Sequence, residues 1–77
     1  MKKYKLISKI ISNYKKDLTK KASNGILKNF GQEEIRDIRE TFNIDPSHSE
    51  DDKLCEELIN EFNIWCKSYG KTKKYIV

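Results

Sequence analysis

A chain of 77 residues provides a single small domain, in which only about 60% of the surface of the unfolded chain becomes buried, so a deep enzyme cleft is not expected. Charged and apolar residues each make up 36% of the chain, with three Gly and one Pro, which favours a small helical protein over a sheet or a disordered chain. The net charge of +4 conceals an asymmetry: residues 1–28 carry nine Lys against one Asp, residues 29–66 three basic against eleven acidic side chains, and residues 67–77 four Lys. This pattern is informative about binding partners and says little about the fold.

The first predicted element is a helix over residues 3–23. Its apolar side chains recur at helical spacing on the side expected to face the core: Leu6, Ile7, Ile10, Ile11, Tyr14, Leu18 and Ala22. The opposite side carries four aligned lysines, here called the lysine ridge: Lys5, Lys9, Lys16 and Lys20. Ser12 lies between them. The ridge is either a solvated face or a track for phosphates or for an acidic protein surface.

A short second helix is predicted over residues 32–43. Asn24-Gly25 is expected to end the first helix, and the apolar residues Ile26, Leu27 and Phe30 are expected to hold the connector against the core. Gly31 suits the N-cap position, with Phe30 and Ile35 as a hydrophobic staple. The helix has a narrow apolar edge, made by Ile35, Ile38 and Phe42, and a separate acidic side, made by Glu33, Asp37 and Glu40.

The third predicted helix covers residues 49–69 and follows a turn that contains Pro46. Ser49 suits the N-cap, although Ser47 with Glu50 matches a capping box equally well. A broad apolar stripe holds the only Trp and both Cys: Leu54, Cys55, Leu58, Ile59, Phe62, Trp65, Cys66 and Tyr69. Gly70 is expected to stop this helix. The predicted fold is all-α, a compact three-helix bundle forming one domain over 1–77, with 70–77 as a basic C-terminal tail.

Several classes of function and location are not expected. Cys55 and Cys66 lie about 16 Å apart along one predicted helix, whereas a disulfide needs Cα atoms within about 7 Å, so they should be free buried thiols of a reduced protein. His48 is the lone His and lies in a loop, so we expect no metal, no cofactor and no catalytic residue. The N-terminus lacks the apolar region of a signal peptide, and no stretch approaches the roughly 18 apolar residues of a membrane span. We expect a soluble cytoplasmic protein without membrane association.

Two surfaces are candidates for binding. The third helix would be repelled from a DNA groove by Glu56, Glu57 and Glu61, so nucleic acid should instead meet the lysine ridge and the tail lysines, Lys71, Lys73 and Lys74. A protein partner could meet the outer face of the third helix, made by Glu56, Glu57, Asn60, Glu61 and an exposed Ile64. The acidic side of the second helix could join that face, or the chain's own basic helix could neutralise it. The opposed charges also leave a homodimer open.

Two stretches carry a resemblance. The residues GILKNFGQEEIR from Gly25 to Arg36, followed by INEFNIWC over 59–66, resemble small uncharacterised proteins of phages and integrative elements of low-GC Gram-positive bacteria. The resemblance implies a genomic context in which nucleic-acid-binding regulators and inhibitors of host defence are common, and it assigns no functional residue. We expect a non-enzymatic protein that binds a host protein or nucleoprotein complex stoichiometrically, as a host-takeover factor or defence inhibitor such as an anti-CRISPR protein. The alternative is a DNA- or RNA-binding regulator that uses the lysine ridge.

Overall fold

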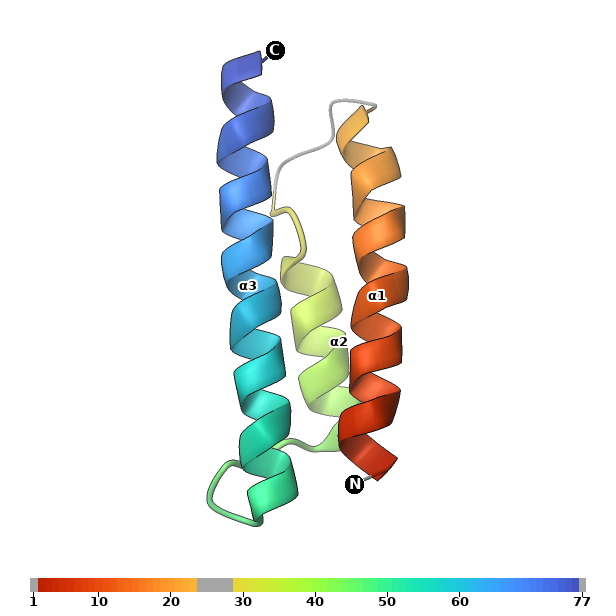
Figure 1. Ribbon diagram of the computed structural model, residues 1–77, viewed down its shortest axis with the longest axis vertical. Helices are drawn as coiled ribbons and strands as arrows, with labels where there is room; N and C mark the ends of the chain where they lie inside the picture. Colours follow the sequence, from red (N-terminus) through yellow and green to blue (C-terminus); the bar gives the residue numbers. More distant parts are fainter. Residues whose placement is uncertain (1, 24–28, 77) are drawn as a thin grey trace.

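The computed structural model describes the backbone of residues 2–23 and 29–76 and the side chains of residues 3–22 and 29–69. Over these residues the chain forms three helices and no strand: α1 (Lys2–Ser23), α2 (Gln32–Phe42) and α3 (Glu50–Ile76). The long helices α1 and α3 run side by side in the same direction, and the short α2 runs the opposite way beside their lower halves (Figure 1). The bundle measures 42 × 18 × 16 Å. The predicted all-α three-helix bundle is confirmed.

Gly31 fixes the start of α2. It is the N-cap, with a left-handed backbone (φ 81°), and its carbonyl accepts a hydrogen bond from the Ile35 N–H at 3.1 Å. Phe30 and Ile35, the two predicted staple residues, are both buried. A Cβ atom at Gly31 would overlap Cys66 Sγ of α3, so the absence of a side chain is required by packing as well as by φ. The predicted N-cap is confirmed.

The turn between α2 and α3 resolves the two capping alternatives. Asn43 ends α2 in a left-handed conformation and donates its N–H to the Arg39 carbonyl. Ser49 Oγ accepts a hydrogen bond from the Asp52 N–H at 3.1 Å, so Ser49 is the N-cap of α3. Ser47 instead donates its hydroxyl to Asp45 Oδ1 at 2.7 Å and its N–H to the same oxygen at 3.0 Å.

The predicted end of the third helix is wrong. α3 continues through Gly70 to Ile76, so the backbone of residues 70–76 is helical and is not a separate tail. An interior Gly costs a helix only about 1 kcal/mol relative to Ala. The lysines that follow Gly70 are good helix formers, and positive charge near a helix C-terminus is favoured by the dipole. The other predicted helix end, at Asn24-Gly25, and the predicted packing of Ile26 and Leu27 lie outside the described residues.

The core matches the predicted stripes with one exception on α1. Its buried apolar residues come from all three helices and from the residue before Gly31: Ile7, Ile11, Leu18, Ala22, Phe30, Ile35, Ile38, Cys55, Ile59, Phe62 and Cys66. The prediction for Leu6 is wrong, because this side chain is 52% exposed. It lies at the edge of the apolar side of α1. The cysteines are free and buried, as predicted.

The fully buried part of the apolar stripe on α3 is narrower than the sequence indicates. Phe62 is 1% exposed, whereas Trp65 and Tyr69 are only partly buried and pack against the core from its edge. Among the described side chains, the Trp65 ring has three aromatic neighbours, with centroids 6.0 Å from Phe30, 6.0 Å from Phe62 and 5.2 Å from Tyr69. The largest fully buried side chain is therefore Phe62 and not the Trp.

Candidate functional site

The lysine ridge is exposed along the outer side of α1. Lys5, Lys9, Lys16 and Lys20 are all exposed, as is Ser12 between them. The lysines form two pairs, each spanning four residues or about 6 Å of helix axis, with about 10 Å between the pairs. Among the described side chains, none of the four forms an ion pair with a carboxylate. The ridge thus presents four ammonium groups to solvent.

Three other basic side chains of the bundle are paired with a carboxylate of the chain. Lys3 Nζ lies 2.7 Å from Asp52 Oδ1, Arg39 lies 2.7 Å from Glu56, and Lys21 lies 3.8 Å from Glu34. Asp52, Glu34 and Glu56 are therefore neutralised within the chain. The described ion pairs do not include the predicted acidic side of the second helix, Glu33, Asp37 and Glu40, so its expected neutralisation by the basic helix is not seen.

Lys15 differs from the ridge lysines because it lies over an aromatic ring. Its Nζ is 5.4 Å from the centroid of Trp65, within the range of a cation–π contact. Lys15, Lys16, Thr19 and Lys20 line a shallow surface hollow beside it. Non-specific binding of single-stranded nucleic acid combines lysines with aromatic faces on which bases stack. Here the ring beside the ridge, Trp65, is contacted by Lys15 and by aromatic neighbours, which leaves less of its face for a base.

The outer face of α3 is exposed at most of its predicted positions. Ile64 is 67% exposed, and Glu57, Asn60 and Glu61 are exposed around it. Glu56 differs from them, since it is half-buried and is held by Arg39 of α2. Four of the five predicted residues are thus available to a partner, and the fifth fastens α2 to α3. The side chains of the other predicted residues, Lys71, Lys73 and Lys74, lie outside the described residues.

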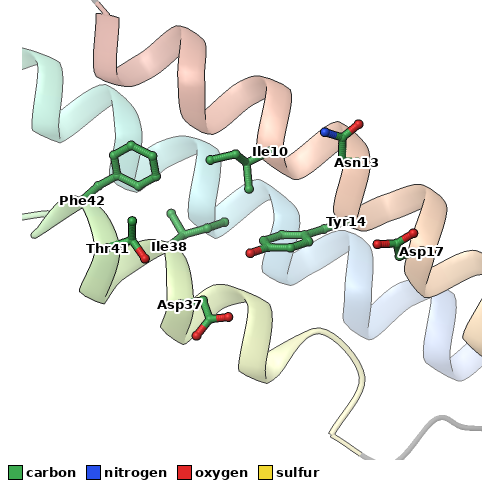
Figure 2. A pocket seen from close by; sticks show the side chains of 8 residues that line it. All are labelled: Ile10, Asn13, Tyr14, Asp17, Asp37, Ile38, Thr41 and Phe42. Atoms are coloured by element: carbon green, nitrogen blue, oxygen red, sulfur yellow. The ribbon is translucent and has the colours of Figure 1, made fainter.

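A groove between α1 and α2 was not predicted. It encloses about 280 Å³ and is lined by four residues from each helix: Ile10, Asn13, Tyr14, Asp17, Asp37, Ile38, Thr41 and Phe42. Ile10, Ile38 and Phe42 lie toward one end and Asp17 toward the other, beyond the Tyr14 ring, while Asp37 lies on the α2 side below Ile38 (Figure 2). Burial, with smaller contributions from Asp37 and Glu34, raises the pKa of the Tyr14 hydroxyl above its ordinary value of 10.0, so it stays protonated at neutral pH.

A second unpredicted feature is a buried carboxylate, Asp52, which is 2% exposed. It accepts hydrogen bonds from Lys3 Nζ at 2.7 Å and from the Asp45 N–H at 3.3 Å, and His48 Nδ1 lies 3.9 Å away. The hydrogen bond from Lys3 is the main cause that holds the pKa of Asp52 below its ordinary value of 3.8. Asp52 therefore fastens the start of α1 and the turn before α3 to the same point. These two hydrogen bonds across the fold indicate a structural role.

Chemistry based on thiols or metal ions finds no support in the described part of the chain. The side chains described include no group of three or more His, Cys, Asp or Glu placed to hold a metal ion. Burial raises the pKa of both thiols, that of Cys66 to about 11, and the neutral thiol is a poor nucleophile. None of the described helices has the length and apolarity that crossing a membrane requires.

Comparison of the chain with protein-family models, with curated proteins and with solved structures finds no significant match in any of the three. Function is therefore inferred from the surfaces of this chain and from the sequence resemblance described above.

Proposed function

We propose that this protein is a non-enzymatic binding protein of a phage or mobile genetic element that attaches stoichiometrically to a host protein or nucleoprotein complex. This proposal covers two types of protein: a defence inhibitor, such as an anti-CRISPR protein, and a host-takeover factor. The proposal is carried by one observation: four exposed lysines of α1 have no carboxylate partner among the described side chains, while Lys3, Lys21 and Arg39 each have one.

An unpaired row of ammonium groups attracts a negatively charged surface and speeds the encounter with it. Charge of this kind supplies steering and orientation, and apolar contacts at the centre of an interface supply much of the affinity. The exposed side chain of Ile64, on the outer face of α3, can make such a contact with a protein partner. Association driven by the ridge should therefore weaken as salt screens the charges.

The test compares two variants of equal net charge. Lys9→Glu with Lys16→Glu reverses two ridge positions, whereas Arg36→Glu with Lys53→Glu reverses two exposed positions away from the ridge. Each pair lowers the net charge from +4 to 0. Tagged full-length protein is used to recover partners from nuclease-treated bacterial extract, and the affinity for each partner is then measured with purified components. The ridge variant should bind at least about tenfold more weakly than the control variant. Equal binding by both variants, or no protein partner at all, would refute the proposal.

The ridge also supports the alternative, a DNA- or RNA-binding regulator. Lysines of this kind contact phosphates without reading sequence. If all four contact phosphates of duplex DNA, the slope of log K against log salt concentration should be about −3.6. An electrophoretic shift with generic duplex DNA at about 100 mM salt, an ionic strength at which such contacts still hold, decides the matter. A shift that the ridge variant loses and the control variant keeps would favour the regulator over the protein-binding function.

A further inference from the structure

The groove between α1 and α2 is an incompletely covered part of the core. Ile10, Tyr14 and Phe42 are only partly buried although they pack against buried residues, and Ile38 at the bottom is 1% exposed. Leu6 lies one helical turn before Ile10 on the same side of α1 and is 52% exposed, so the apolar strip continues past the groove. An exposed strip of this kind is a common feature of surfaces that receive another helix.

The groove carries charge of one sign only. Asp17 from α1 and Asp37 from α2 are the only charged residues among the described ones that line it, and both are exposed. Neither forms an ion pair with a basic side chain among the described residues. Asp17 lies beyond the Tyr14 ring, at the end away from Phe42, and Asp37 lies on the α2 side, below Ile38 (Figure 2). The two carboxylates therefore attract cations to the far end and to the α2 side of the groove, whereas the end at Ile10 and Phe42 is apolar.

We propose that this groove binds an amphipathic helix of a partner protein, whose apolar side chains cover Ile10, Ile38 and Phe42 and whose Lys or Arg pairs with Asp17, while Asp37 adds negative charge along the α2 side. A helix fits because a side-chain ridge packs into the groove between two neighbouring helices at an axial separation of about 8–10 Å. Ile10 and Asp17 are seven residues apart on α1, which is about 10 Å or two turns. The partner helix thus carries its basic residue about two turns from its apolar anchor.

A second copy of this chain is a poorer occupant. A symmetric dimer through the groove would bring the same patch of both copies together, so Asp17 and Asp37 of one copy would meet their counterparts on the other. Four carboxylates at one interface repel each other, and none of the described lining residues is basic. The groove proposal goes beyond the proposed function of the ridge, because it concerns a different face of α1 and a partner of opposite charge.

The probe is a displayed library of 16-residue helical peptides with an Ala-based background and one randomised face, selected against the full chain. Enriched peptides should combine large apolar residues one turn apart with Lys or Arg about two turns from the first. Their affinity should fall about tenfold or more for Asp17→Asn with Asp37→Asn, as expected for loss of charge-assisted contacts. It should not fall for Lys9→Glu with Lys16→Glu. Both carboxylates are exposed, so the Asn variant should keep its circular dichroism spectrum.

The location of binding is read from backbone amide chemical shifts of the full chain. Perturbation should be largest at Ile10, Tyr14, Ile38 and Phe42. The proposal is overturned by selection without enrichment of basic residues, by equal affinity for the Asn variant, or by shifts confined to the ridge. It is also overturned if light scattering shows a dimer that Leu6→Asp dissociates, since a second copy would then occupy the groove. Failure here leaves the ridge comparison unaffected.

Discussion

Gly31→Ala should be among the most damaging single changes that this chain can undergo, although it adds only one methyl group. The left-handed conformation (φ 81°) costs a residue with a Cβ about 1–2 kcal/mol. The new methyl group would overlap Cys66 Sγ and lie 3.0 Å from Cys66 Cβ, and displacing a packed core side chain costs about 1–3 kcal/mol. The sum is about 2–5 kcal/mol, against a total stability near the low end of about 5–15 kcal/mol for so small a domain.

The measurement is urea unfolding followed by circular dichroism at 222 nm, with Cys66→Ala as the partner mutation. Cys66→Ala alone should cost about 1 kcal/mol, since it removes one buried atom of roughly methylene size. The double variant should lose less stability than the sum of the two single variants, because the overlapping sulfur is gone. A loss below about 1 kcal/mol for Gly31→Ala, or strict additivity in the double variant, would refute the argument from close packing.

Gly70→Ala is the matched control, because the two glycines should respond with opposite signs. Gly70 lies within α3, where replacing Gly by Ala stabilises a helix by about 0.5–1 kcal/mol. A loss of stability would mean that Gly70 ends the helix after all, as its position in the sequence suggests.

Three further changes test other parts of the fold by the same unfolding measurement. Phe62→Ala should lower the free energy of unfolding by about 3–5 kcal/mol and Trp65→Ala by clearly less, because Phe62 is 1% exposed and Trp65 is half-buried. The reverse order would contradict the assignment of Phe62 to the centre of the core. Ser49→Ala should cost about 1 kcal/mol of stability by removing the cap of α3, and Ser47→Ala should cost less. An equal loss for Ser47→Ala would contradict the assignment of Ser49 as the cap. The pKa of Asp52 is lowered in the folded protein, so its contribution to stability is complete above pH 3.8 and is lost as pH falls through the folded-state pKa. Asp52→Asn should therefore destabilise the protein at pH 7 and less so in acid. A difference in stability between Asp52→Asn and the original protein that does not change with pH would contradict the pairing with Lys3.

The sequence predicts those parts of the fold that depend on local chemistry. Hydrophobic period locates all three helices, and Gly31 is recognisable as a cap from Phe30 and Ile35 on either side. The turn at Pro46 follows from the missing amide and the restricted residue before it. Exposure of Ile64 also follows from helical period alone, since the residue lies opposite the buried stripe. These features need no knowledge of which helix packs against which.

The features that sequence reasoning misses depend on how the helices meet. Asp52 looks like an ordinary first-turn acid, and only the approach of Lys3 from α1 explains its burial. Glu56 looks exposed until Arg39 of α2 reaches it. Leu6 belongs to the apolar side of α1 by period, yet it remains 52% exposed. The groove lined by Asp17 and Asp37 depends on how α1 and α2 pack, and the sequence predicts only that these two helices are neighbours.

The labelling rates of the two buried thiols also report how this bundle opens in solution. A labelling reagent reacts with thiolate, and Cys55 and Cys66 are 0% and 1% exposed with raised pKa values, so each reacts only when its surroundings open. Cys55 lies in the second turn of α3, and Cys66 lies three turns further along, against Gly31. Equal labelling rates would mean that the bundle opens as one cooperative unit, and unequal rates would identify which end of α3 separates from its neighbours first.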